Sequence, residues 1–552
     1  MKVTPPRPDA HADTDGTVVF PSARTADASE LAPVSGGFLA KATLVTAGLS
    51  IVGALLGLVR DQALARLFGA GSETDAFLVA WTVPEFASTL FIEDGLSFAL
   101  IPAFSLALAR RAQGAPGDPV RSLVVATLPW LSLAFVAVSA LVIGTAPYLV
   151  EALAPGLPDP GLAVDCTRVT ALSVLGFGLA GYCSAALRAH RTFLAPAAIY
   201  VAYNAGIITA MFVLGGQWGV RSAAVGVAVG GALMVAIQLP SVWRQSRRRA
   251  APRVASAEAP GQSMTLAMVA TVLLFALCRQ SQVLIERFLA SALPAGAISH
   301  LNYAQKVAQI PMTLSLMLCT VTFPVVARAL ADGDTERARD RVERDLALAA
   351  CLVLLGAATV IACAPQMVEL LFQRGEFTAA DTAATAEVMR VYALGLLSQT
   401  LVGCLVRSHF SAGRSTWYPL GAMAVGIVTT AGVGSWTVGP WGVAGIAAAN
   451  AIGITVTALM LLAGMGARNV PIRTRRVLAG LSRTLCAAVV ATVTGAFTAS
   501  QFDSAVPGLA AGSLTVVAVF VLLARALNVQ GVASALRSLR TVTRRLSHAR
   551  FR

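Results

Sequence analysis

The chain has 552 residues, of which 56% are hydrophobic and only 13% are charged, and its formal net charge is +14. Because soluble domains usually carry about 25% charged residues, this composition excludes an ordinary soluble fold and indicates a polytopic membrane protein. The basic residues cluster in short loops between apolar segments without interleaved aromatic residues, so they indicate membrane topology and argue against a nucleic-acid partner.

Residues 1–36 are rich in Pro, Asp, Ser, Thr and Ala and have no apolar core before a small-residue cleavage site. This composition predicts a disordered cytoplasmic tail and not a signal peptide. The first apolar segment, which starts near Phe38, would then act as its own insertion signal.

After this tail we identify fourteen apolar stretches, each of about the 20 residues that an α-helix needs to cross a bilayer. They predict an all-α polytopic membrane protein with about fourteen transmembrane helices. The second and eighth stretches are long and contain prolines, which membrane helices tolerate when neighbours satisfy the freed carbonyls. The stretches lie near residues 38–60, 75–104, 122–146, 164–187, 193–214, 220–241, 264–290, 296–327, 345–364, 382–406, 416–436, 440–463, 480–500 and 507–527.

The arginines are concentrated in every second loop, and the alternate loops are nearly free of Lys and Arg, with Arg374 as the main exception. Under the positive-inside rule the arginine-rich loops are cytoplasmic. Both termini are therefore expected in the cytoplasm, which requires an even number of spans.

A weak internal repeat predicts the domain organisation. Residues 187–190 read LRAH near the end of the fourth stretch, and residues 406–409 read VRSH near the end of the tenth. This pattern predicts two six-helix lobes in the same orientation around a central cavity, followed by two C-terminal helices. Chance similarity between apolar helices that end in arginine is the alternative. The predicted parts are a tail at 1–36, an N-lobe at 37–243, a basic cytoplasmic linker at 244–262, a C-lobe at 263–465, two helices at 466–527 and a basic cytoplasmic tail at 528–552.

Arg60, Asp61 and Lys306 stand out as charges inside apolar stretches. A charge at the bilayer centre costs roughly 2.5 to 3.5 kcal/mol on insertion scales, so such residues face a bundle interior or a watery cavity. Their positive surplus predicts an anionic passenger, because Arg and Lys can replace the hydration of phosphate oxygens with charge-assisted hydrogen bonds. The alternatives are an interfacial ion pair at Arg60-Asp61 and a snorkelling side chain at Lys306. For Glu85 and Asp94 we favour a purely structural role.

Other chemistry is not indicated by the sequence. The eight cysteines are scattered singly without a Cys/His cluster, so neither a disulfide framework nor a metal site is expected. No nucleophile with a neighbouring base and no Walker sequence is recognisable. We therefore expect no enzymatic activity and no cofactor, with transport coupled to the membrane potential or to an ion gradient.

Two motifs carry a resemblance to a known family. Residues 57–77 read GLVRDQALARLFGAGSETDAF, and residues 371–378 read LFQRGEFT. Both resemble the MurJ/MviN family of lipid II flippases, within the multidrug/oligosaccharidyl-lipid/polysaccharide exporter superfamily, and the resemblance covers about residues 38–527. It implies a V-shaped bundle whose central cavity opens alternately to either side of the bacterial cytoplasmic membrane. The implied substrate is lipid II, an undecaprenyl pyrophosphate carrying a disaccharide-peptide, which moves from the inner to the outer leaflet.

The resemblance also implies site residues. Arg60 and Lys306 match two cationic cavity positions of the family, with lysine replacing the usual arginine at 306, and Asp61, Asp75 and Glu93 match acidic positions.

Two arginines that the family commonly has in the cavity are absent, and Ala54 and Ser88 stand at their positions. Ser88 is kept with the five matched residues as a substrate-binding candidate. Arg279, Glu286 and Arg287 in the seventh stretch are candidate cavity residues that would partly compensate.

The leading hypothesis is thus a lipid II flippase whose partners are the lipid-linked substrate, membrane lipids and cell-wall synthesis proteins. The absent arginines leave open a flippase or exporter of another polyprenyl-linked glycan. A non-transporting membrane scaffold in cell-wall synthesis is a third hypothesis. The basic segment 535–552 is expected either to lie as a helix on anionic lipid or to be a solvated topology signal.

Overall fold

The computed structural model describes residues 36–93, 95–114, 117–247, 266–316, 334–410, 417–465 and 472–529. Within these ranges all regular secondary structure is helical, which confirms the predicted all-α class. By its contacts the chain divides into a short N-terminal unit, Met1–Val45, and a large unit, Thr46–Arg552, which holds every element from the body of α1 onward. The predicted tail at 1–36, most of the linker at 244–262, the C-terminal tail from 530 and Asp94 lie outside the described residues.

The described part of the first half of the chain forms eleven elements before the linker. They are α1 (Gly36–Phe68), α2 (Ser72–Ala80), α3 (Thr82–Ser88), the π-helical turn η1 (Thr89–Glu93), α4 (Gly95–Ala112), α5 (Pro119–Leu153), α6 (Pro160–Ala171), α7 (Ser173–Ala189), α8 (Leu194–Trp218), α9 (Arg221–Ala236) and α10 (Leu239–Arg247).

The second half begins after the linker and ends with two helices that pack on each other and on α14. Its elements are α11 (Leu266–Ser291), α12 (Ala297–Ala308), α14 (Thr335–Ala362), α15 (Ala364–Phe372), α16 (Ala379–Ala393), α17 (Leu396–Phe410), α18 (Tyr418–Ala463), α19 (Thr474–Ala499) and α20 (Ala505–Ala526).

Ten helices in the described part of the chain are long and apolar enough to cross a membrane, or eleven if the bent pair α16 and α17 forms one span. The predicted stretches 416–436 and 440–463 both fall in α18, which bends at Gly442, where φ is +53°. The eighth stretch begins with α12 and a helical segment at 310–316 and then leaves the described residues. The chain is thus a multi-pass membrane protein, and fourteen spans stays a prediction.

The second span, Ser72–Ala112, is interrupted at Trp81, between α2 and α3, three residues before the proline that the sequence predicts to interrupt it. Proline has no N–H, so the carbonyl of Ala80, four residues earlier, lacks its helical donor. The Thr170 hydroxyl of α6 donates to that carbonyl at 3.2 Å. The neighbouring helix therefore satisfies the backbone group that the proline releases, as the interior of a membrane requires.

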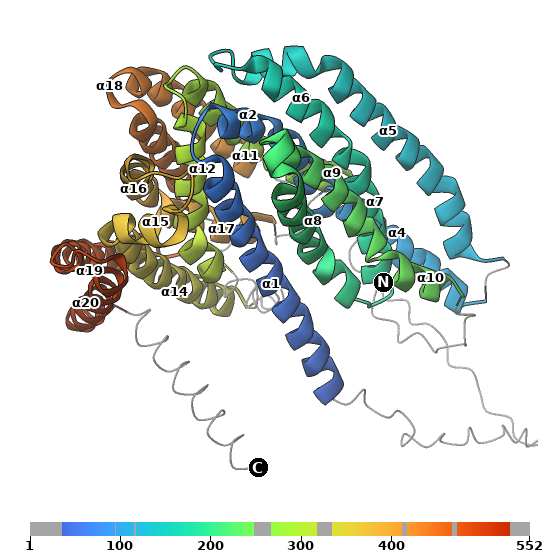
Figure 1. The fold of residues 1–552 in the computed structure, drawn as a ribbon. Helices are drawn as coiled ribbons and strands as arrows, with labels where there is room; N and C mark the ends of the chain where they lie inside the picture. The colour runs from blue at the N-terminus through green and yellow to red at the C-terminus, as the bar shows by residue number, and fades with distance from the viewer. Residues whose placement is uncertain are drawn as a thin grey trace, which may run out of the picture. The chain divides into compact units, whose positions relative to one another are not determined.

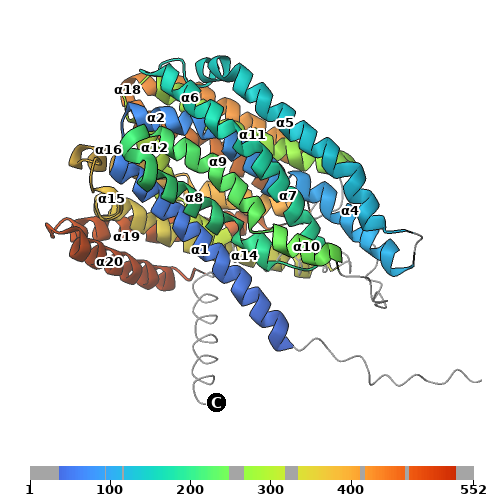
Figure 2. The same ribbon diagram turned by 45° about the vertical axis from the view of Figure 1, so that its right-hand side comes forward.

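Helices of the first half pack closely through small residues. Figures 1 and 2 show α7, α8 and α9 side by side. A Cβ at Gly226 of α9 would lie 2.7 Å from the Cα of Ile207 on α8, and a Cβ at Gly230 would lie equally close to the ring of Tyr203. Small residues allow this approach, which is how membrane helices gain van der Waals contact without a hydrophobic driving force. The packing holds α8 in register, and α8 carries several residues of the site described next.

Candidate functional site

A cavity of about 250 Å³ lies between the two halves of the chain. We call it the central cavity. Its walls come from α1, the broken span α2–η1, α7 and α8 of the first half, and from α11 and α12 of the second half. The residues that line it are Arg60, Trp81, Pro84, Glu85, Ser88, Thr89, Glu93, Phe177, Tyr200, Tyr203, Asn204, Arg279, Gln280 and Lys306.

Arg60 is held firmly on one side of this cavity. Its guanidinium donates twice to Asp61 Oδ1, at 3.0 and 2.7 Å, and once to Asn204 Oδ1 at 3.1 Å. The guanidinium carbon also lies 4.5 Å from the ring centre of Trp81, within the range of a cation–π contact. Neighbouring residues on a helix do not normally face each other, so the Arg60 side chain folds back onto Asp61. These partners fix the direction of the charge.

Glu85 connects the two halves of the chain. Its Oε2 accepts a hydrogen bond from Arg287 of α11 at 3.0 Å, and its Oε1 lies 3.9 Å from Lys306 Nζ of α12. Arg287 also donates to the hydroxyl of Thr82. The Arg287 side chain is only 7% exposed, whereas that of Lys306 is 36% exposed. Arg287 is therefore the buried partner of Glu85, and Lys306 is the more exposed of the two and lines the cavity.

Polar side chains form the rim of the cavity. The hydroxyls of Ser88 and Tyr200 lie 3.1 Å apart, and each donates to Glu93 Oε1 at 3.2 Å. Arg279 is exposed, lines the cavity and makes no hydrogen bond or ion pair with any described residue. The Tyr203 hydroxyl is buried and likewise finds no partner among the described residues. Among these groups Arg279 is the donor that is both exposed and available to a ligand.

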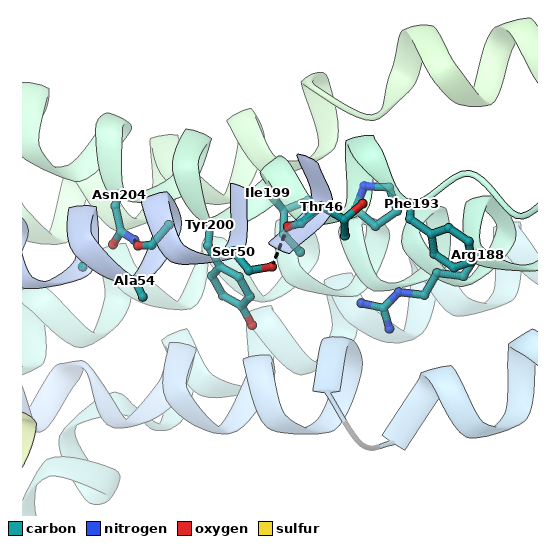
Figure 3. Close-up of a pocket in the computed structure, with 12 residues that line it drawn as sticks. Thr46, Ser50, Ala54, Arg188, Phe193, Ile199, Tyr200 and Asn204 are labelled. Atoms are coloured by element: carbon teal, nitrogen blue, oxygen red, sulfur yellow. Dashed lines mark hydrogen bonds between the residues drawn. The ribbon is translucent and has the colours of Figure 1, made fainter. Parts of the chain in front are cut away.

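A second space of about 460 Å³ adjoins the central cavity, and we call it the side pocket. It is formed by α1, the end of α7 and α8, and it shares Tyr200 and Asn204 with the central cavity. Figure 3 shows the Arg188 guanidinium and the Tyr200 hydroxyl directed to the same side. The lining residues are Thr46, Ser50, Gly53, Ala54, Gly57, Arg188, Phe193, Pro196, Ala197, Ile199, Tyr200 and Asn204.

At one end the backbones of the two halves are in direct contact. This end is made of the loops 69–71, 292–296 and 373–378, and we call it the closed end. Glu376 N donates to Arg66 O at 3.1 Å. Gly69 (φ +66°) and Gly375 (φ +65°) both adopt the left-handed conformation that favours glycine. A Cβ at Gly69 would lie 2.8 Å from Glu376 O, and one at Gly375 would collide with Arg66 O. No side chain fits between these backbones.

Asp75 adds a further contact between the two halves at the closed end, and it does not line the central cavity. It is 3% exposed, and its carboxylate accepts from Gly296 N at 2.7 Å and from Ser299 N at 2.8 Å. These donors belong to the first turn of α12, where a carboxylate satisfies free N–H groups and the helix dipole. Gly296 itself has φ +96°. The structure therefore places Asp75 as a cap that joins the halves, away from where the sequence analysis expects a substrate contact.

The other predicted residues divide into two groups. Arg60, Ser88, Glu93, Arg279 and Lys306 line the central cavity, with Asp61 directly behind Arg60. Glu286 and Arg287 are buried next to it, and Glu286 accepts a hydrogen bond from Asn450 of α18. Ala54 and Ser88, where the family's arginines are absent, line the side pocket and the central cavity respectively.

Sequence reasoning missed several residues of the site. Glu85 is interpreted there as structural, yet it is the acceptor between Arg287 and Lys306. The sequence did contain a signal for Glu85, because a carboxylate in an apolar stretch costs as much insertion free energy as the charge of Arg60. Tyr200 and Asn204 lie four residues apart, which places two polar groups on one face of a helix.

Comparisons with known proteins agree with this architecture. The family model described as Lipid II flippase MurJ matches residues 64–516. The chain is 27% identical over 445 residues to a Burkholderia cenocepacia protein named Lipid II flippase MurJ, covering 78% of this chain and 84% of that one. It is 27% identical over 459 residues to a probable lipid II flippase MurJ of Rhizobium meliloti, covering 79% and 83%.

Solved structures show the same fold. A lipid II flippase MurJ in an inward closed conformation superposes with a TM-score of 0.69 at 18% identity, over 87% of this chain and 98% of the other. An inward-facing multidrug resistance MATE family transporter of the MOP superfamily superposes with a TM-score of 0.61 at 15% identity, over 80% and 99%. Because the family model covers most of the chain, the chain belongs to the MurJ family.

Proposed function

We propose that the chain is a flippase for lipid II, the pyrophosphate-linked peptidoglycan precursor, and that it works by alternating access. The observation that carries the proposal is the meeting of Arg60 and Lys306, from opposite halves of the chain, on one small cavity. A pyrophosphate head must leave water to cross the membrane, and charge-assisted hydrogen bonds from two cations would replace its hydration. Arg60 supplies a planar guanidinium, whose bonds to Asp61 and Asn204 the substrate would replace, and Lys306 supplies a mobile point charge.

Glu85 supplies the switching step of this mechanism. The Glu85 carboxylate binds Arg287 and lies near Lys306. A phosphate oxygen would bind the same cations. A bound pyrophosphate would compete with Glu85 for Lys306 and would thus weaken the ionic contact between α3 and α12. Ligand binding would thus change the contact between the halves, which is the differential interaction that any ligand-driven conformational change requires.

The closed end defines the state of the molecule in this cycle. The positive-inside rule puts its loops on the outer side of the membrane, because they alternate with the arginine-rich loops, and puts both termini in the cytoplasm. The structure then corresponds to a state closed to the outside, in which the substrate enters from the inner leaflet. Release to the outer leaflet requires the contacts of Gly69, Gly375 and Gly296 to separate. Transport would be coupled to the membrane potential or an ion gradient.

Complementation of a bacterial strain depleted of its own flippase tests the proposal. We expect Arg60→Ala and Lys306→Ala to abolish growth rescue while the proteins still insert in normal amounts, and lipid II to accumulate at the inner leaflet. Arg221→Gln is the matched control, because its ion pair with Asp165 is half exposed and outside both pockets. Full rescue by both alanine variants would contradict transport and favour a scaffold in cell-wall synthesis.

The arginine positions occupied by Ala54 and Ser88 favour a second candidate, a flippase for another polyprenyl-linked glycan. The same depletion strain distinguishes the two. If the chain fails to clear lipid II but clears another lipid-linked pyrophosphate from the inner leaflet, the second candidate replaces the first.

A further inference from the structure

A buried carboxyl group in the second half of the chain has no counter-ion of its own. Glu286 of α11 is 3% exposed and forms no ion pair with any residue that the structure describes. The neighbouring Arg287 is already bound to Glu85 and to the hydroxyl of Thr82 on α3. An ionised carboxylate that leaves water without a cation is costly, and such a group takes up a proton instead. The position therefore favours the neutral acid.

The hydrogen bonding of Glu286 points the same way. The side-chain amide of Asn450 in α18 donates to Glu286 Oε1, and Asn450 Oδ1 is buried without a hydrogen-bond partner among the described residues. A carboxylate has no hydrogen to donate to Oδ1, whereas a carboxylic acid has one O–H donor. With a proton on Glu286, the acid and the amide can pair through two hydrogen bonds. Protonation thus satisfies a buried acceptor that the ionised form leaves open.

The surroundings of Glu286 connect its charge with the junction of the two halves. Within the described part of the chain, the charged and titratable groups around it are Arg287 on its own helix, Glu85 of α3 and Tyr392 of α16. A negative charge on Glu286 attracts Arg287 and repels Glu85. Ionisation of Glu286 therefore weakens the ion pair between Glu85 and Arg287, and protonation strengthens it. The Tyr392 hydroxyl is bound at 2.9 to 3.0 Å by three amides, those of Gln305, Gln309 and Gln399.

We propose that Glu286 is a proton-binding site that couples the transport cycle to a proton gradient. The inference rests on the function proposed above and deepens it, because it names the coupling ion and the residue that binds it. In the state closed to the outside, the acid is protonated and paired with Asn450. After the closed end has opened, the Glu286 carboxylate takes one proton from the outer solution, and this uptake returns the empty protein to the closed state. The proton then leaves to the cytoplasm, so one proton moves inward for each substrate moved outward.

Infrared difference spectroscopy of the purified full chain in nanodiscs tests whether Glu286 holds a proton. An ordinary glutamate is ionised at about pH 7. We expect a carboxylic-acid band of the parent chain at this pH that Glu286→Gln lacks. Asn450→Leu should move the band to higher frequency, because the acid carbonyl loses its hydrogen bond. Glu369→Gln, the same substitution at an exposed position of α15, is the control and should leave the band unchanged.

The same spectra can contradict the site. A parent chain without such a band, a band that survives Glu286→Gln, or one that Asn450→Leu leaves in place each overturns the proposal. If Glu286→Gln does not insert, Glu286→Asp replaces it, and a band that does not move then counts against Glu286.

The accessibility of the closed end should depend on pH through this proton. As the pH rises, Glu286 loses its proton and the closed state loses the paired acid. Labelling of a cysteine near the closed end of the parent chain in nanodiscs should then increase, by up to about tenfold per pH unit for one linked proton. Glu286→Gln, which stays neutral, should be labelled little at every pH. Equal pH dependence of the two proteins would contradict the coupling.

Transport in the flippase-depleted strain separates this inference from the proposed function. Nigericin collapses the pH gradient, and it should slow the clearance of lipid II from the inner leaflet by the parent chain. Glu286→Gln should be slow with or without nigericin. Clearance by the parent chain that nigericin does not change would overturn proton coupling and leave the flippase function intact. A parent chain that clears no lipid II would contradict the flippase function, and with it the coupling.

Discussion

Glu85 of α3 and Arg287 of α11 form an ion pair of 3.0 Å that joins the two halves of the chain next to the central cavity. The two residues are 202 positions apart in the sequence. The arginine side chain is almost fully buried, and this carboxylate compensates its charge. Any group that competes with Arg287 for Glu85 would therefore also weaken the packing of the two halves.

Replacing Glu85 should destabilise the protein more than replacing an exposed carboxylate. Glu85→Gln leaves the buried Arg287 charge without its counter-ion, which costs about 3 kcal/mol. Thermal unfolding of the purified protein in nanodiscs measures the change. Asp165→Asn, which breaks the exposed pair with Arg221, is the control and should cost less than about 1 kcal/mol. Equal effects of the two substitutions would argue that the Glu85 contact adds nothing to the junction of the halves.

The closed end should open when a side chain is introduced between its backbones. Gly69→Ala strains a residue with φ +66° and places a Cβ 2.8 Å from Glu376 O. We expect a larger share of molecules open at this end, measured by labelling of a cysteine introduced nearby with a membrane-impermeant reagent. Gly71→Ala is the control, because that glycine has φ −138° and a Cβ there would meet nothing within 4 Å. Identical labelling of the two variants would show that main-chain contact at Gly69 does not hold this end closed.

Asp75→Asn distinguishes a cap from a substrate contact. The amide keeps one acceptor oxygen but loses the charge, so the first turn of α12 loses part of its capping. We expect a loss of about 1 to 2 kcal/mol in unfolding free energy. Affinity of the folded protein for undecaprenyl diphosphate should not change, and a fall of about tenfold at full stability would instead place Asp75 in the binding site.

Part of the contribution of the Thr170 hydroxyl, which also donates to Thr167 O at 3.1 Å, should depend on the presence of Pro84. Thr170→Val removes the donor to Ala80 O and is expected to cost about 1 kcal/mol. In a Pro84→Ala background residue 84 regains its N–H, which can serve that carbonyl, so the cost of Thr170→Val should shrink. Thr167→Val on the same helix is the control, since that hydroxyl bonds only to Ala163 O within α6. Additive effects of Thr170→Val and Pro84→Ala would contradict the link.

The sequence was most informative where the signal is local. The adjacent pair Arg60-Asp61 is evident from the cost of charge in an apolar stretch, and the structure indeed pairs these two side chains. An interruption close to Pro84 was also predictable, because the missing N–H acts within one helix, and the structure has it at Trp81.

Contacts between residues that are far apart in the sequence could not be predicted from local patterns. Glu85 looked structural because its partners, Arg287 and Lys306, come from helices far along the chain, and nothing near position 85 indicates them. Asp75 looked like a cavity residue because a carboxylate that caps a distant helix and one that faces a ligand have the same local sequence.

The contact of Arg66 and Glu376 has a consequence for how the protein responds to its surroundings. The bond joins an amide hydrogen to a peptide oxygen, and neither atom titrates or attracts counter-ions. Acid or salt can therefore act on this end through the Asp75 carboxylate, which accepts from Gly296 N and Ser299 N, but not through the bond between Arg66 and Glu376. In the transport cycle proposed above, the force that opens this end has to act through charged groups such as Asp75 and the pair of Glu85 and Arg287, because the main-chain bond itself carries no charge.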